Sequence, residues 1–278
     1  MKCKVNDLPI YYEIHGEGHP IVMIHGFTPD HRLMAGCMEP VFAHQQGWQR
    51  IYFDLPGMGK TPGKEWITNS DQILDVVLQF INKTLPDRSF VLASESYGCY
   101  LARGIIQQRP EFVDGLLMIC PLVIAEDEKR SLPAQEILVQ DDTLLSNLDP
   151  SEVEEFKLFS TVLTPAIWNR FKLEVLSGIR IAVDEDFLGR IRTEGYSFSF
   201  DVDRLSKPFP KPGLFLFGRQ DALVGYRDAW SIIENFPRST FAVLDRAAHN
   251  LQIEQETVFT VLVNEWLGRV REALILKS

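Results

Sequence analysis

The chain has 278 residues, 45% of them apolar and 11% aromatic, enough to bury the core of one large α/β domain or two modest ones. Its formal charge of −10 disfavours a nucleic-acid-binding protein, because such a surface needs clustered Lys and Arg. The four cysteines lack metal-ligand spacing, and the sequence begins without the apolar run of a signal peptide. No apolar stretch reaches the roughly 20 residues that span a bilayer. We therefore expect a soluble, cytoplasmic protein that binds neither nucleic acid nor membranes.

Short apolar runs alternate with helix-like stretches in the first half of the sequence. Helices are expected over 70–82, capped by Asn69 or Ser70, and over 97–109. The later apolar runs are continuous, as in strands buried on both faces of a parallel sheet. Alternation of strand and helix predicts a doubly wound α/β sheet. Strands are predicted, in chain order, over residues 10–14, 21–24, 51–53, 90–93 and 116–119.

The alternation stops after residue 121, and residues 122–207 are helix-like and charged. Ser151 followed by Glu154 is typical of a capping box at a helix start. The acidic run 184–186 offers another helix start. Ten acids against two bases between residues 126 and 155 indicate a solvated helical face or a surface that repels anions.

The strand pattern returns after this segment. Apolar runs over 214–217 and 241–244 predict two further buried strands, and 257–270 has the pattern of a closing amphipathic helix. The sequence thus predicts one α/β core formed by residues 1–121 and 208–278, interrupted by a helical insertion over 122–207.

The pentapeptide Ser94-Glu95-Ser96-Tyr97-Gly98 lies where a predicted strand ends and a predicted helix begins. A nucleophilic serine on such a sharp turn needs very small residues two positions before and after it. Centring the G-x-S-x-G pattern on Ser96 places Gly98 at the second small position. Ser94 takes the first position, where serine replaces glycine. The alternative is a serine that only caps the helix.

An activated serine needs a base, and the base needs an acid that orients it. His249 follows the last predicted strand, and Asp221 follows the strand before it. With Ser96, all three would lie beyond the carboxyl ends of separate strands, the edge where open α/β sheets form their sites. Asp245 and the pair Glu126–Asp127 are weaker candidates for the acid.

With the order Ser96, Asp221, His249, the sequence resembles the α/β-hydrolase superfamily, in its capped serine-hydrolase branch. Two further motifs carry the resemblance: the His-Gly pair of His25-Gly26-Phe27 and the Asp-x-x-Gly-x-Gly loop over 54–59. The likeness covers nearly the whole chain outside the insertion. It implies that Ser96 is the nucleophile, Asp221 the acid and His249 the base, and that the insertion forms a helical cap over the active site.

The resemblance also implies an oxyanion hole made by the backbone N–H groups of Phe27 and Tyr97. Losing one such donor costs roughly 2.7–4 kcal/mol of transition-state stabilisation. Within the insertion, Phe159, Trp168 and Phe198 are candidate walls of a substrate pocket, or else core residues of the cap. No cofactor or metal is expected, because no H-E-x-x-H or similar ligand pattern occurs.

Three functions are compatible with these residues. The leading one is hydrolysis of a small to medium, largely apolar ester through an acyl-enzyme on Ser96. The second is carbon–carbon bond hydrolysis of vinylogous diketones, although members of that branch usually have a Gly-rich oxyanion loop and an aromatic residue soon after the histidine. This chain has Phe27-Thr28-Pro29 and Asn250-Leu251 at those places. The third is a ligand-sensing homologue with slow or no turnover.

Overall fold

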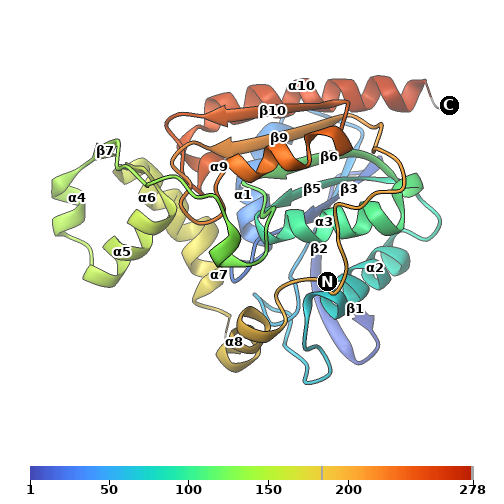
Figure 1. Ribbon diagram of the computed structural model, residues 1–278, viewed down its shortest axis with the longest axis horizontal. Helices are drawn as coiled ribbons and strands as arrows, with labels where there is room; N and C mark the ends of the chain where they lie inside the picture. Colours follow the sequence, from blue (N-terminus) through green and yellow to red (C-terminus); the bar gives the residue numbers. More distant parts are fainter. Residues whose placement is uncertain (183, 277–278) are drawn as a thin grey trace.

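The computed structural model describes residues 1–182 and 184–276. Within these residues a single large sheet forms the centre of the molecule (Figure 1). Its strands are β1 (Lys2–Val5), β2 (Leu8–His15), β3 (His19–Ile24), β4 (Trp48–Phe53), β5 (Phe90–Glu95), β6 (Val113–Ile119), β9 (Gly213–Gly218) and β10 (Ser239–Leu244). They lie in the order β1-β2-β4-β3-β5-β6-β9-β10. β1, β2 and β4 pair antiparallel, and the strands from β4 to β10 run parallel.

Helices cover both faces of this sheet. The helices of the core are α1 (His31–Phe42), α2 (Ser70–Thr84), α3 (Tyr97–Gln108), α9 (Leu251–Glu254) and α10 (Glu256–Ile275). α1 and α10 pack on one face, and α2 and α3 pack on the other (Figure 1). This confirms the predicted α/β fold class. None of the helices in the described part of the chain has the length and apolar character needed to cross a membrane.

Two features of the core differ from the sequence-based prediction. β10 is the edge strand, and residues 241–244 are only partly buried, although their apolar run predicted burial on both faces. A continuous apolar run does not distinguish a central strand from an edge strand with one covered face. Helix α1 was not predicted, because Gly36 and Pro40 interrupt its pattern. It forms because one side of it, which includes Met34 and Met38, is buried in the core.

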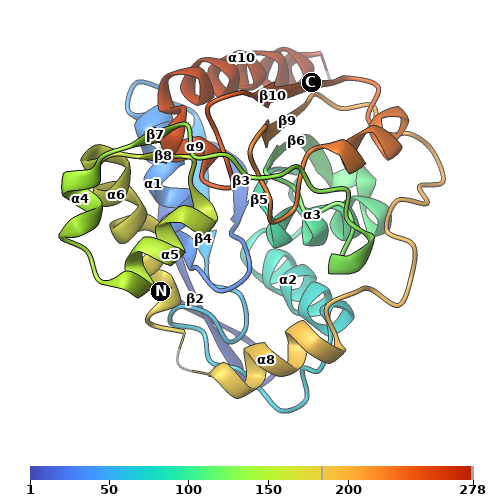
Figure 2. The ribbon, with the colours of Figure 1, turned by 60° about the vertical axis from the view of Figure 1, so that its left-hand side comes forward.

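Residues 122–207 leave the core after β6 and return before β9. Their elements are β7 (Val139–Gln140), α4 (Asp142–Ser146), α5 (Pro150–Phe159), β8 (Val162–Leu163), α6 (Pro165–Phe171), a π-helical turn (Lys172–Leu176), α7 (Ser177–Ile179) and α8 (Glu185–Glu194). α4, α5 and α6 project together from one end of the sheet, and α8 lies apart from them beside α2 (Figures 1 and 2). The amide of Ser70, at the start of α2, donates to the carbonyl of Gly195, just after α8.

The two helix starts predicted in the insertion have different outcomes. Asp184 caps α8, and its side chain accepts a hydrogen bond from the amide of Phe187, as expected for an acidic start. The prediction of a capping box at Ser151 and Glu154 is wrong. Helix α5 has Asp149 as its N-cap and begins at Pro150, because the fixed φ of proline suits the first helical position.

One buried arginine joins both ends of the insertion to helix α3. Arg103 is 1% exposed, and its Nη2 donates to the carbonyl oxygens of Leu122 and Val123, each at 2.8 Å. Its Nη1 forms an ion pair with the carboxylate of Asp203. A buried guanidinium must be paired in this way, so the contacts fix where the chain leaves the core and where it returns.

Replacing Arg103 with Met should lower the free energy of unfolding by about 3–5 kcal/mol, because the two buried carbonyls and the carboxylate lose their partner. Arg109→Met, at the half-buried C-cap of the same helix, is the matched control. Its guanidinium binds the exposed side chain of Asn82, so the variant should change the free energy of unfolding by less than about 1 kcal/mol. Urea unfolding of both variants measures the difference. Similar values for the two variants would show that the buried guanidinium does not hold the insertion.

Candidate active site

Ser96 lies on a sharp turn between β5 and α3. Its φ of +49° is in the left-handed region that non-glycine residues seldom adopt, and its amide donates to the carbonyl of Ile119 at 2.9 Å. The strand and the helix approach closely here. A Cβ at Gly98 would lie only 2.3 Å from the carbonyl oxygen of Ile24, so glycine is required there. The backbone therefore fixes the direction of the Ser96 side chain.

Ser94 occupies the position where the motif usually has glycine. Its side chain is fully buried, and its hydroxyl donates to the carbonyl of Leu117 on the neighbouring strand β6 at 3.1 Å. The extra hydroxyl is thus satisfied within the sheet, and the turn forms without glycine at this position.

The structure brings together the three side chains that the sequence singled out. Nε2 of His249 lies 3.0 Å from Oγ of Ser96, and Nδ1 lies 2.8 Å from a carboxylate oxygen of Asp221. Because a carboxylate only accepts, Nδ1 carries a proton, and in the neutral imidazole Nε2 is the nitrogen that can accept from the serine hydroxyl. The other oxygen of Asp221 accepts from the amides of Leu223 and Val224 at 2.9 and 3.1 Å, which fixes its orientation.

A second carboxylate, which sequence reasoning missed, reaches the same imidazole. Glu95 is the last residue of β5 and 2% exposed, and its Oε1 lies 3.2 Å from Nε2 of His249. Gly26 lies directly against this carboxylate, since a Cβ at Gly26 would be 2.2 Å from Oε2. Burial raises the pKa of Glu95 to about 7, and the charge of His249 opposes that shift. The available signal was a charged residue within the pentapeptide 94–98, two positions after the apolar run 90–93.

These carboxylates determine the protonation of His249. Burial by itself would lower the pKa of the imidazole, since desolvation disfavours the charged form. The charge and the hydrogen bond of Asp221, together with the charge of Glu95, outweigh burial and raise the pKa of His249 to about 9. The imidazolium is therefore strongly stabilised, as a group that receives a proton from serine requires.

The cavity beside Ser96 has a volume of about 20 Å³, enough for one water molecule. Most of its wall is apolar, and the described residues that line it are Gly26, Phe27, Pro29, Leu33, Glu95, Ser96, Phe159, Val175, His249 and Asn250. Phe27 belongs to the loop expected to form the oxyanion hole, and Phe159 was a candidate pocket residue. Because Phe159 and Val175 come from the insertion, the insertion forms part of the wall of this cavity.

The other candidate pocket residues lie elsewhere. Trp168 packs against Phe156 and Phe171, with ring centres 5.2 and 5.9 Å away, inside the insertion. Phe198 stacks on Tyr100 at 4.2 Å, over helix α3. Neither is in the lining of the Ser96 cavity as the described residues form it. Trp168 thus packs within the insertion, and Phe198 packs the insertion against the core, as is usual for large aromatic side chains.

The ring of Tyr97 is likewise used for packing. It meets the ring of Phe27 edge-on at 5.4 Å and stacks on Tyr196 at 5.0 Å. Its hydroxyl is hydrogen-bonded to that of Ser70 at 2.7 Å. Its backbone amide belongs to the first residue of α3, where amides have no partner within the helix.

The loop that carries His249 is hydrogen-bonded to the insertion. One oxygen of the Glu254 carboxylate accepts from the amides of Thr161 and Val162 at 2.6 and 2.8 Å, and the other accepts from Ala248 at 2.7 Å. The backbone N–H of Asn250, next to His249, donates to the carbonyl of Phe159 at 3.0 Å. The position of the imidazole and that of the insertion are therefore coupled.

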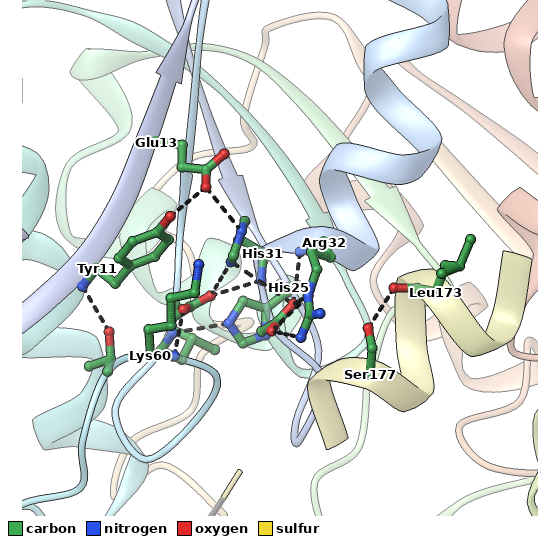
Figure 3. A network of polar contacts seen from close by, with 12 residues as sticks. Tyr11, Glu13, His25, His31, Arg32, Lys60, Leu173 and Ser177 are labelled. Atoms are coloured by element: carbon green, nitrogen blue, oxygen red, sulfur yellow. Dashed lines mark hydrogen bonds and ion pairs between the residues drawn. The ribbon is translucent and has the colours of Figure 1, made fainter. Parts of the chain in front are cut away.

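A network of polar contacts surrounds His25 and His31, which lie close to Phe27 in the sequence (Figure 3). One carboxylate oxygen of Asp54 accepts from the amide and from Nδ1 of His31, at 2.9 and 2.7 Å. Nε2 of His25 accepts from the amide of Leu55 at 3.0 Å. The ligand atoms of Asp30, His31 and Asp54 lie within 4.8 Å of one another, a spacing that could hold a metal ion. The hydrogen bonds of Asp54 give the group a structural use, as an anchor for the loop.

Similarities to known proteins extend over nearly the whole chain. A sequence model of the alpha/beta hydrolase fold matches residues 19–256. A pimeloyl-[acyl-carrier protein] methyl ester esterase of Legionella pneumophila (strain Paris) is 25% identical over 262 residues, covering 93% of this chain and 99% of that protein. A 2-hydroxy-6-oxononadienedioate/2-hydroxy-6-oxononatrienedioate hydrolase of Burkholderia vietnamiensis (strain G4 / LMG 22486) is 25% identical, covering 95% and 92%. The crystal structure of an alpha/beta superfamily hydrolase from Oenococcus oeni PSU-1 has a TM-score of 0.85 at 26% identity, covering 94% and 96%.

Replacing Gly98 with Ala should lower the free energy of unfolding by about 1–3 kcal/mol, because the backbone oxygen of Ile24 cannot give way to the methyl group. The matched control is Gly189→Ala in helix α8, where a Cβ meets nothing within 4 Å. It should raise the free energy of unfolding by about 0.5–1 kcal/mol through helix propensity. Urea unfolding compares them, and a stable Gly98→Ala variant would contradict the close approach at the turn.

Proposed function

The chain belongs to the alpha/beta hydrolase fold family, and we propose that it is a serine hydrolase that cleaves an ester-like substrate through an acyl-enzyme on Ser96. The observation that carries the proposal is the contact of Ser96 Oγ with His249 Nε2 at 3.0 Å, while Nδ1 is held by Asp221. A hydroxyl is a weak nucleophile until a base accepts its proton, and this arrangement supplies the base in the required tautomer.

In the proposed reaction, Oγ of Ser96 attacks the ester carbonyl while its proton passes to Nε2 of His249. Asp221 stabilises the imidazolium, which then gives the proton to the leaving alcohol. Water, deprotonated by the same imidazole, releases the acid from Ser96. We assign the oxyanion to the backbone N–H groups of Phe27 and Tyr97. The lining of the cavity by Phe27 and the place of Tyr97 at the first position of α3 support this assignment.

We further propose that residues 122–207 act as a helical cap that must move to admit the substrate. A cavity of about 20 Å³ holds a water molecule but no ester. Phe159 and Val175 close it from the side of the insertion. The apolar lining favours a small to medium, largely apolar acyl group.

The net negative charge of the proposed cap disfavours a negatively charged leaving group. Residues 122–207 contain seventeen Asp or Glu and ten Lys or Arg. The relative from Legionella pneumophila acts, by its name, on a methyl ester attached to an acyl-carrier protein. An acidic cap repels any partner with an acidic surface, so we favour a neutral small-molecule ester for this chain.

A carbon–carbon bond hydrolase is the second candidate, because the relative from Burkholderia vietnamiensis carries such a substrate in its name and covers 95% of this chain. The same serine, histidine and aspartate would serve that reaction. The chain has Phe27-Thr28-Pro29 in the oxyanion loop and Asn250-Leu251 after His249, which favours ester hydrolysis.

A panel of p-nitrophenyl esters of increasing chain length, assayed beside Ser96→Ala, tests the proposal. We expect activity on short acyl chains, and a loss of roughly 10⁴–10⁶-fold in kcat in the variant, because the nucleophile is gone. Ser94→Ala is the matched control. Its hydroxyl binds the carbonyl of Leu117 and not the imidazole, so the variant should keep the activity of the wild type.

A fluorophosphonate probe gives a second measurement that needs no knowledge of the substrate. It should label Ser96 in the wild type and in Ser94→Ala, and leave Ser96→Ala unlabelled. Folded wild-type protein that resists the probe would overturn the proposal. Turnover of a vinylogous diketone with no turnover of any ester would favour the second candidate.

A further inference from the structure

Nε2 of His249 has two partners in this structure, and the proposed mechanism uses one of them. Oγ of Ser96 lies at 3.0 Å and Oε1 of Glu95 at 3.2 Å. We propose that Glu95 is a positioning residue whose carboxylate competes with the Ser96 hydroxyl for Nε2 of His249, and so sets the pH above which Ser96 becomes nucleophilic. The proposal rests on the proposed roles of Ser96 and His249.

The competition follows from the hydrogen-bonding capacity of an imidazole nitrogen. Nε2 offers either one N–H or one lone pair. When His249 is protonated, N–H donates preferentially to the ionised carboxylate of Glu95, because such a charge-assisted bond is stronger than a bond to a hydroxyl. When His249 is neutral, an ionised Glu95 has no proton to offer, and the lone pair accepts from Ser96. The ion pair is thus the resting state, and the neutral imidazole is the active base.

Glu95 is held in place for this contact. Its backbone continues β5, where it pairs with Ile119 of β6. A Cβ on Gly26 would lie 2.2 Å from Oε2, so the carboxylate fits directly against this loop. Among the described residues, the ion pair formed by Glu95 is the one with His249. A buried carboxylate needs a counter-charge, and the imidazolium supplies it.

Other titratable groups surround the pair. Those coupled electrostatically to Glu95 are His249, Asp221, Cys37 on α1, Cys99 on α3, Cys120 after β6 and Tyr196 from the insertion. Burial raises the pKa of each of these thiols and raises that of the Tyr196 hydroxyl to about 12, so they are neutral near pH 7. Arg130 also faces His249, and its positive charge lowers the imidazole pKa. Asp221, Glu95 and Arg130 are therefore the charges that act on His249.

Glu95→Gln should have two effects with different signs. Removing a negative charge beside His249 lowers the pKa of the imidazole, so the neutral base forms at lower pH. The same change removes a charge that stabilises the imidazolium formed during attack, so the maximal rate at high pH should fall. A residue with only a structural role would lower the rate at every pH and leave the midpoint of the pH profile in place.

The test is the second-order rate constant of fluorophosphonate labelling of Ser96, measured from pH 5 to pH 10. In Glu95→Gln the midpoint of the rise should lie lower than in the wild type by roughly 1–3 pH units. Glu95→Asp keeps the charge and should have a midpoint closer to that of the wild type. Glu39→Gln is the control, since that partly buried carboxylate binds Arg50 and Tyr52 and not Nε2, and its midpoint should match the wild type. An unchanged midpoint in Glu95→Gln would overturn the proposal.

A second measurement separates failure of this proposal from failure of the proposed function. Nitrogen NMR of labelled histidine follows the titration of His249 without any reaction, and comparison with His249→Gln assigns its signals. Glu95→Gln should titrate at lower pH than the wild type by the same shift. If no protein reacts with the probe but the NMR shift occurs, the hydrolase assignment fails while the link between Glu95 and His249 stands. If labelling occurs and neither midpoint moves, the role of Glu95 is refuted and the hydrolase assignment remains.

Discussion

The contact between strand β5 and helix α3 at Ser96 is the constraint on which the rest of the site depends. A left-handed backbone at a serine is costly, and the surrounding structure must overdetermine it. The amide of Ser96 donates a hydrogen bond to the carbonyl of Ile119. Gly98 has no side chain, so the helix can approach the carbonyl of Ile24 closely. The hydroxyl of Ser96 therefore points to one place, and the loops after β9 and β10 bring Asp221 and His249 to that place.

The second constraint on this site is the charge of the carboxylates around His249. A single buried imidazole contacts two carboxylates. The amides of Leu223 and Val224 orient Asp221, and Glu95 lies directly against Gly26. In a low-dielectric interior such fixed groups act strongly on one another. The same arrangement that stabilises the imidazolium during attack also holds it in the resting protein. A higher pKa makes His249 a stronger base but leaves less of it neutral at a given pH. In the proposal, Glu95 sets this pKa.

The insertion is in contact with the residues of this site. Its ends are fixed by Arg103, its side chains Phe159 and Val175 close the cavity, and Glu254 bonds it to the loop of His249. A displacement that opens the cavity must break hydrogen bonds next to the imidazole. In the proposed function, access for the substrate and the position of His249 are therefore coupled.

The sequence by itself determined the α/β sheet and the grouping of Ser96, Asp221 and His249, because buried strands and a strand-to-helix turn leave local patterns that need no knowledge of distant contacts. It also determined the start of α8 at Asp184, a short-range hydrogen bond. Only the tertiary structure decided that β10 is an edge strand, that α1 forms across Gly36 and Pro40, and that Trp168 and Phe198 pack away from the cavity. Only the tertiary structure placed Glu95 on the imidazole. These outcomes depend on which surfaces meet in space, and residues 154 positions apart, such as Glu95 and His249, carry no mutual signal along the chain.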